Sequence, residues 1–148
     1  MDPIHKRIRY SEGDVYEGQW SSEGKREGKG KLQMATGDHY SGEFTNGFFH
    51  GLGVLVHADG SKYEGSFELG RYHGYGIYTN SDKTKYEGQF LQGSVKGFGL
   101  ITFEDGSHGQ PKNEGKFEGF ELVQRCLAAT AVQKARQSAA DARSMQMQ

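Results

Sequence analysis

The side chains that could carry chemistry in this sequence are few and widely spaced. Among the 148 residues are six histidines and a single cysteine, Cys126. One cysteine excludes an internal disulfide and a thiolate metal cluster. His50 and His73 have similar neighbours in the sequence, and in adjacent hairpins they would lie about 10 Å apart, too far to share a metal ion. We therefore expect these histidines to make hydrogen bonds that recur along the chain, and we expect no metal or cofactor.

No nucleophile in the sequence stands beside a suitable base. Cys126 lies in an apolar stretch, where a buried and inert thiol is expected. Glu104 and Asp105 fall in a turn, where an acidic residue serves turn formation. A phosphate-binding loop requires a serine or threonine directly after its Gly-Lys pair. None of the lysines that follow a glycine in this sequence is followed by either residue. The sequence therefore predicts a chain without catalytic activity.

The elements that carry these residues repeat with a period of 23 residues. A Gly-x-Gly pair recurs four times, and an aromatic–glycine–aromatic triplet precedes each pair. The pairs are Gly28/Gly30, Gly51/Gly53, Gly74/Gly76 and Gly97/Gly99, and the triplets are Tyr16-Gly18-Trp20, Tyr40-Gly42-Phe44, Tyr63-Gly65-Phe67 and Tyr86-Gly88-Phe90. An altered fifth copy is Asn113-Gly115-Phe117. A fixed short period indicates an array of one supersecondary unit.

Each copy is typical of a β-hairpin. In the second copy, rings alternate with polar residues and glycine over residues 40–44, which is strand periodicity, and Asn46-Gly47 is a strong turn signal. An aromatic ring that lies over a cross-strand glycine would cover the backbone that glycine leaves bare. The predicted cross-strand pairs are Tyr40 with Gly53, Gly42 with Gly51, and Phe44 with Phe49.

The odd period constrains the second turn of each copy. Two turns of two residues each would need an even period to keep equivalent residues on one face of the sheet. We therefore expect a three-residue connection at Asp59-Gly60-Ser61, with glycine in the left-handed region. The matching glycines are Gly13, Gly37 and Gly106. The fourth copy has Asp82-Lys83 at this place, which predicts a looser or differently shaped turn.

The predicted fold is all-β, an extended single-layer antiparallel sheet of hairpins with a C-terminal capping α-helix. Residues 1–120 would form the array, with about four full repeats and degenerate ends, and residues 121–148 would form the helix and a frayed tail. Residues 122–147 contain neither Gly nor Pro and are rich in Ala, Gln and Arg. We expect a helix over about 121–140 whose first turns pack on the last hairpin and cap the array.

The spaced residues of the second copy resemble the MORN repeat. They are Tyr40, Gly42, Phe44, Asn46, Gly47, His50, Gly51 and Gly53, and the resemblance extends over about residues 8–120. It implies an extended antiparallel sheet of hairpins. Segment 97–117, with its insertion at 109–112, resembles one branch of this family more closely. That closer resemblance implies a small cytosolic adaptor that binds the tail of a class III unconventional myosin in actin-based protrusions such as filopodia, stereocilia and rhabdomeres; composition and spacing alone point to no myosin.

A single-layer sheet cannot bury both faces, so part of the aromatic stripe would stay exposed as an interaction surface. The sequence predicts a groove that binds a peptide through aromatic anchors, with acidic residues that steer a basic partner. The groove residues would be Phe44, Phe49, His57, Phe67, Tyr72, Tyr78, Phe90 and Phe103. The acidic residues would be Glu43, Glu64, Glu68, Glu87 and Glu104. The residues with a structural role would be Tyr16, Trp20, Tyr40, Tyr63, Tyr86, Gly51, Gly53, Gly74, Gly76, Gly97 and Gly99.

Charge and hydropathy leave two other roles open. The net charge of −1 indicates no partner, and nucleic acid, which needs a basic patch, is not expected. A phospholipid-binding module, which the family resemblance also implies, needs a cluster of about four to eight basic residues. The nearest cluster, interrupted by Glu23 and Glu27, is Lys25, Arg26, Lys29 and Lys31.

The third role is a regulatory array whose partner subunit carries an enzymatic activity. Neither a membrane-length apolar run nor a signal-peptide stretch is present, so we expect a cytoplasmic protein with at most weak membrane association.

Overall fold

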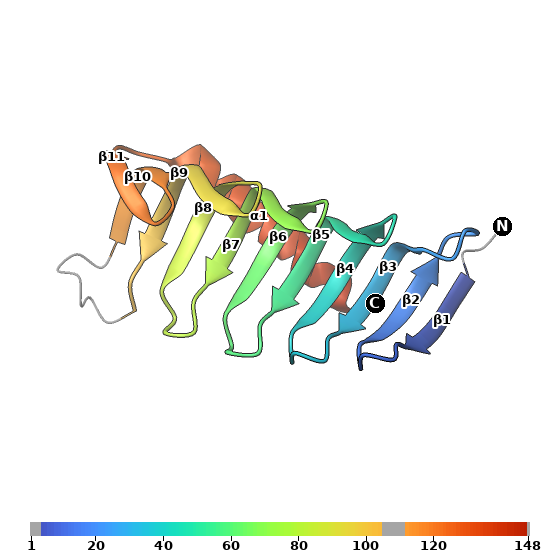
Figure 1. Cartoon of the computed structure of the whole chain (residues 1–148). Coiled ribbons are helices and arrows are strands. Elements are labelled where there is room, and N and C mark those ends of the chain that lie inside the picture. Colours follow the sequence, from blue (N-terminus) through green and yellow to red (C-terminus); the bar gives the residue numbers. More distant parts are fainter. Residues whose placement is uncertain (1–3, 105–111, 148) are drawn as a thin grey trace.

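The described part of the chain folds into one open sheet of eleven antiparallel strands (Figure 1). The computed structural model describes residues 4–104 and 112–147. Each strand pairs with the next one in the sequence, so the sheet is a meander without crossovers. The strands are β1 (Ile4–Arg9), β2 (Val15–Trp20), β3 (Arg26–Gln33), β4 (His39–Thr45), β5 (Phe48–Val56), β6 (Lys62–Glu68), β7 (Arg71–Thr79), β8 (Lys85–Leu91), β9 (Ser94–Thr102), β10 (Lys112–Glu118) and β11 (Glu121–Arg125). The predicted single-layer array of hairpins is confirmed.

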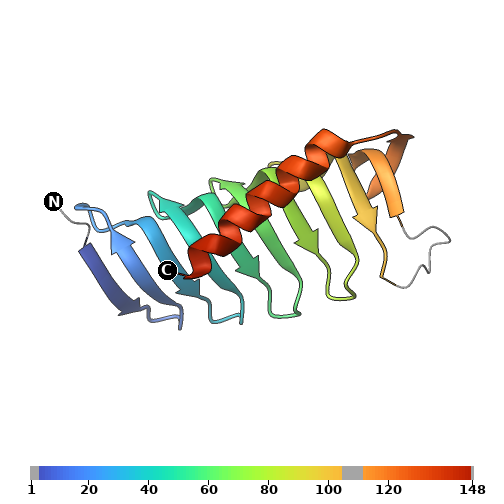
Figure 2. The same cartoon turned by 180° about the vertical axis from the view of Figure 1, so that it is seen from behind.

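The C-terminal helix lies on a face of the sheet and not at its end. Helix α1 (Ala129–Ser144) runs back across the strands from β9 to β5, and the short 3-10 turn η1 (Met145–Met147) reaches β4 (Figure 2). Residues 121–125, which were expected to begin the helix, form β11 instead. They pair with β10 because Leu122 can pack against the aromatic core there.

Small residues allow α1 to lie close to the sheet. Its buried side chains are Ala131, Val132, Ala135, Ala139 and Ala142. Ala135 and Ala139 form one small cluster with Ile77, and Val132 forms a second one with Leu100; both apolar strand residues lie among polar ones on this face. An isolated helix of this length is marginal in water, so the packing on the sheet holds it.

The hairpin register is partly as predicted. Phe44 does pair with Phe49, but Tyr40 pairs with Leu55, and Gly42 pairs with Gly53. The shift of two residues comes from a bulge opposite Glu43, in which Gly51 takes a φ of +95°. A turn signal alone does not reveal such a bulge, because it inserts residues in one strand after the turn has fixed the first pair.

A tyrosine ring covers a glycine in each of the first four copies. A β-carbon built on Gly53 would collide with the ring of Tyr40, whose hydroxyl donates to the backbone oxygen of Glu43 at 2.8 Å. The equivalent bonds run from Tyr16 to Gln19, from Tyr63 to Ser66 and from Tyr86 to Gln89. The predicted packing of rings on cross-strand glycines is therefore confirmed, although the covered glycine lies diagonally from the tyrosine and not directly opposite.

The connection is odd-numbered and its glycine is left-handed, as the period predicts, but the loop begins one residue earlier than the predicted Asp59-Gly60-Ser61. His57 and Ser61 are hydrogen bonded across a three-residue loop of Ala58, Asp59 and Gly60, and Gly60 has a φ of +91°. Gly13 and Gly37 adopt the same left-handed conformation, while Gly106 lies outside the described residues.

The expectation of a different turn in the fourth copy is wrong. The Asn80 N–H donates to the Thr84 oxygen at 2.8 Å, and the Lys83 N–H donates to the Asn80 oxygen at 2.9 Å, the same pattern as around Gly60. Lys83 simply takes the left-handed conformation, with a φ of +75°. The neighbouring strands fix the loop, and the lysine backbone adapts to it.

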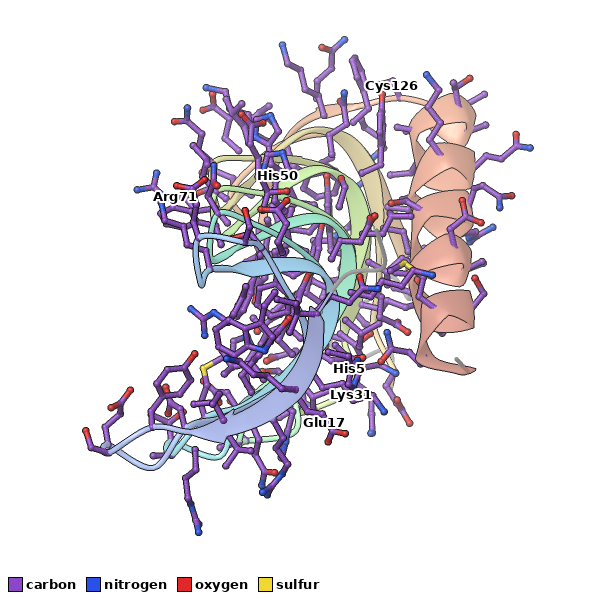
Figure 3. All side chains as sticks on the ribbon, turned by 90° about the vertical axis from the view of Figure 1, so that its right-hand side faces the viewer. His5, Glu17, Lys31, His50, Arg71 and Cys126 are labelled. Carbon is purple, nitrogen blue, oxygen red and sulfur yellow. The ribbon has the colours of Figure 1, made fainter. Side chains whose placement is uncertain are left out.

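The sheet has two unlike faces. The main apolar core lies on one face and consists mostly of the tyrosines, phenylalanines and leucines that follow the strand alternation. The strands curve strongly, and α1 lies on the outer, convex side (Figure 3). Because α1 packs on Ile77 and Leu100 and not on the aromatic cluster, the aromatic face is the concave one.

Candidate binding surfaces

The floor of the concave face is formed by buried rings. Phe44, Phe67 and Phe90 are only 2%, 3% and 5% exposed. Each packs edge-to-face on the tyrosine of its own copy, with ring centroids 5.0 to 5.3 Å apart. These three residues were predicted to line the groove, but they lie beneath its surface. Strand alternation gives the face on which a ring lies and not its depth.

A second layer of rings covers this floor in the middle of the array. Phe49 stacks on Tyr40 with centroids 3.8 Å apart, and Tyr72 stacks on Tyr63 at 4.1 Å. Phe49 and Tyr72 are half-buried, so one side of each ring meets solvent. The structure thus brings these two predicted groove residues together on one surface.

His57 joins this second layer to the edge of the sheet. Its Nε2 lies 2.7 Å from the Tyr72 hydroxyl, and its Nδ1 lies 3.7 Å from a carboxylate oxygen of Asp38. Burial raises the pKa of Tyr72 far above its usual value, so the hydroxyl stays protonated. The contact positions the Tyr72 ring, which gives His57 a role within the groove wall.

The C-terminal part of the concave face contains a hollow of about 410 Å³. Tyr78 and Phe103, both predicted groove residues, line it together with Ile101 and Asp82. Phe120, which the sequence analysis missed, closes it and is 62% exposed. A signal was present, because Phe120 stands at the turn position that glycine fills in the three preceding copies.

The N-terminal part of the concave face carries a cation instead. The Arg26 guanidinium lies 5.6 to 5.9 Å from the ring centres of Tyr10, Tyr16 and Phe44. It also donates to the Gly47 oxygen at 3.0 Å. The groove therefore carries a cation at its N-terminal end and an apolar hollow, bordered by Asp82, at its C-terminal end.

Most of the predicted steering carboxylates do not face the groove. Glu64 and Glu87 are 5% and 2% exposed beneath α1. Arg136 makes two hydrogen bonds to Glu87, at 2.7 and 3.2 Å, and Arg143 makes one to Glu64 at 3.2 Å. These two glutamates therefore anchor the helix and are not available to a partner in the groove.

The other three predicted carboxylates differ among themselves. Glu43 is also on the convex side, where its carboxylate accepts the Leu52 N–H at 2.7 Å and fills the bulge. Glu68 is exposed and lies 3.1 Å from Nε2 of His73. Glu104 is exposed.

Aspartates in or directly after the three-residue loops supply acidic groups beside the groove. Asp38 contacts His57, and Asp82 lines the hollow near Tyr78. Hydrogen bonds from Ser61 hold the pKa of Asp59 below its usual value. The sequence analysis named Asp59 and Asp82 only as loop residues and did not consider Asp38, yet their charges lie along one border of the concave face.

The recurring histidines do make the expected hydrogen bonds. Nδ1 of His50 accepts the Leu69 N–H, and Nδ1 of His73 accepts the Gln92 N–H, each at 3.2 Å. Glu27 does the same for the Asn46 N–H at 3.0 Å. In these three copies, the side chain at this position therefore ties the strand that carries it to the short turn of the following copy.

The described residues show no arrangement of metal ligands. Within residues 4–104 and 112–147, no three His, Cys, Asp or Glu side chains gather as a metal site would need. In the same part of the chain, no helix has the length and apolar character to cross a membrane. Cys126 is half-buried.

Comparison with known proteins agrees with this geometry. The MORN repeat family model matches four consecutive segments, 16–39, 40–62, 63–85 and 86–108. Over 136 residues, the chain is 57% identical to the MORN repeat-containing protein 4 homolog of Drosophila melanogaster, and the match covers 92% of this chain and 69% of that protein. With its hairpins, covered glycines and repeat period, the chain therefore belongs to the MORN repeat family.

Proposed function

We propose that this protein is a noncatalytic adaptor whose concave face binds a peptide segment of a partner protein. The observation that carries this is the row of partly exposed rings formed by Phe49, Tyr72, Tyr78, Phe103 and Phe120, all on the face that α1 leaves open. Half-buried aromatic rings on a rigid surface are typical anchors of protein interfaces. A sheet held by its own floor of buried rings needs no rearrangement to present them.

The partner segment would be apolar with basic residues on one side. The rings would bury its apolar side chains, and the loop carboxylates of Asp38, Asp59 and Asp82 would attract its cations. The tail of a class III unconventional myosin is the partner that the family branch suggests, and the similarity to a MORN repeat-containing protein 4 homolog supports the choice of that branch. We place the protein in the cytoplasm, concentrated in actin-based protrusions.

The structure does not favour the membrane-surface alternative as the sequence framed it. Of its basic cluster, Arg26 lies on the concave face over aromatic rings, and Lys25 lies beside the turn after β2. Lys29 and Lys31 lie on the convex face. The four cations therefore do not form one surface that a bilayer could meet.

Binding to a synthetic class III myosin tail peptide tests the proposal. Phe103→Ala and Phe120→Ala together should weaken binding by about tenfold or more, because truncating interface anchors costs over about 1 kcal/mol each. Phe48→Ala is the matched control, since this phenylalanine is 50% exposed but neighbours Phe49 and so points to the other side of the strand. Unchanged affinity in the double variant, with circular dichroism showing an intact fold, would exclude the concave hollow as the binding site.

A further inference from the structure

The part of the convex face that α1 leaves uncovered carries a cluster of cations. Helix α1 and η1 extend only as far as β4, so the convex side of β1, β2 and β3 is open (Figure 2). Strand alternation directs one basic group after another to this side. We call the following residues, all exposed, the basic convex patch: His5, Arg7, Arg9, Lys29 and Lys31.

The patch is only partly neutralised by its own carboxylates. Glu17 lies between Arg7 and Lys31 in the register, and its Oε2 is 4.0 Å from Nε2 of His5. Glu43 pairs with Lys29 across the strands, but one of its oxygens already accepts the Leu52 N–H. Four arginines and lysines thus meet two carboxylates in this part of the described chain. Under α1, by contrast, the helix arginines balance the buried glutamates.

The patch surrounds two adjoining hollows of about 350 and 400 Å³. Both are lined by Glu17, Lys31 and Ser41. Met145 borders the first hollow and Gln146 the second, so the end of the helical segment forms one wall of each. Figure 3 shows His5, Glu17 and Lys31 together on the side of the sheet where the helix lies.

We propose that the basic convex patch binds an acidic segment of a partner protein. The charge excess favours an anionic ligand, and the hollows admit a narrow chain that would continue the interface begun by α1. A helix is about 10 Å thick, so α1 rises above the patch and holds a flat bilayer away from it. Because the patch and the concave groove are on opposite faces, the two surfaces can be occupied together.

The probe is a fluorescent peptide of alternating Glu and Ala residues, titrated at low ionic strength with the full chain. Arg7→Gln combined with Lys31→Gln should weaken binding by about tenfold, because each substitution removes one exposed charge pair with the peptide. Glu17→Gln should strengthen binding about threefold, because it removes the carboxylate between the two cations. A gain of affinity cannot come from misfolding, so this variant protects the test against a loss of structure.

Lys96→Gln with Lys116→Gln is the matched control, since it removes the same charge from exposed positions on β9 and β10. It should leave the affinity within about twofold. Failure of the peptide to bind, or equal effects of the two double variants, would overturn the proposal. Binding of vesicles with about a fifth phosphatidylserine in place of the peptide would also overturn it and assign the patch to membranes.

Discussion

At the scale of single residues, Lys83 holds a backbone conformation that suits glycine. Its φ is +75°, and Gly60 has +91° at the same place in the preceding copy. An L-residue in this region costs about 1–2 kcal/mol of backbone strain. Glycine removes this strain, but it also raises the conformational entropy of the unfolded chain, which offsets part of the gain in stability. We therefore expect Lys83→Gly to raise the free energy of unfolding by about 0.5–1 kcal/mol in urea denaturation.

Gly60→Ala is the reverse experiment and its control. A β-carbon at Gly60 would meet no atom within 4 Å, so only the backbone conformation is tested. The free energy of unfolding should fall by about 1 kcal/mol. If both variants match the parent, the three-residue loops do not hold these residues in the left-handed region.

Residue identities predicted much of the core and little of the groove surface. The repeat of Tyr, Gly and Phe is enough to place rings over glycines, because only glycine leaves room for them. Whether a given ring is floor or surface depends on the next ring along the chain, as Phe49 on Tyr40 shows. The fate of Glu64 and Glu87 depends on the path of a helix far away in sequence, so their local pattern could not reveal it.

The buried tyrosines predict a sharp response to alkaline pH. Burial raises the pKa of Tyr16 to about 12 and raises those of Tyr40, Tyr63 and Tyr86 further. The unfolded chain ionises near the usual value of about 10, so it loses protons first. The stabilisation that the protonated, buried tyrosines give the folded state is fully present below about pH 10. It is lost as the pH rises through the pKa values of these tyrosines in the folded protein.

We therefore expect cooperative unfolding at a pH above about 10. Phenolate absorbance and the β-sheet circular dichroism should change with the same midpoint, because the rings ionise only when the sheet opens. Ionisation of most tyrosines near pH 10 with the sheet intact would show that the rings are accessible to water in the folded state.

At the scale of elements, the spacing of two arginines along α1 matches the spacing of successive hairpins in the sheet. Arg136 and Arg143 are seven residues apart, a rise of about 10.5 Å along a helix. Their partners Glu87 and Glu64 are one hairpin apart, which is about 9.6 Å of sheet. The helix can therefore meet successive copies with the same side chain. Both spacings are visible in the sequence, but only the packing of small residues on Ile77 reveals that they are coupled.

Arg136→Ala should destabilise the protein more than its exposed position implies. It leaves the carboxylate of Glu87, 2% exposed, without its cation. Loss of one partner of a buried pair costs several kcal/mol, and since Arg136 is itself partly in water we expect about 2 kcal/mol from thermal or urea unfolding. Adding Glu87→Gln should recover part of this loss, because the unpaired charge is then gone.

Arg125→Ala provides the comparison for that experiment. Arg125 is an exposed arginine whose hydrogen bond to Asn113 is 3.4 Å long and exposed. Its replacement should change the free energy of unfolding by less than about 0.5 kcal/mol. Similar effects of the two arginine variants would mean that the Glu87 pair does not hold the helix on the sheet.

At the scale of the whole molecule, the array gains its stability from contacts between neighbours. Each strand pairs only with the strands before and after it, and α1 adds contacts across β5 to β9. In such an array, stability is close to a sum of terms for each repeat and each interface. The aromatic rings of the concave face also contact mainly their neighbours, because Phe49 and Tyr72 each stack on the tyrosine of the preceding strand.

Duplication of residues 40–62 directly after residue 62 therefore should give a longer folded protein. The new copy brings its own Tyr40, Gly53 and three-residue loop. Its two strands can pair with the strands on either side in the same register that β4 and β5 use with β3 and β6. The ion pairs of α1 with Glu64 and Glu87 stay in place, because the insertion lies on their N-terminal side. Small-angle scattering should show the long dimension increased by about 10 Å, and urea unfolding should show a free energy at least equal to that of the parent. A collapsed or unfolded product would mean that the copies depend on contacts beyond those between neighbouring strands. A folded product would carry a concave face one copy longer, on which partner affinity can be measured.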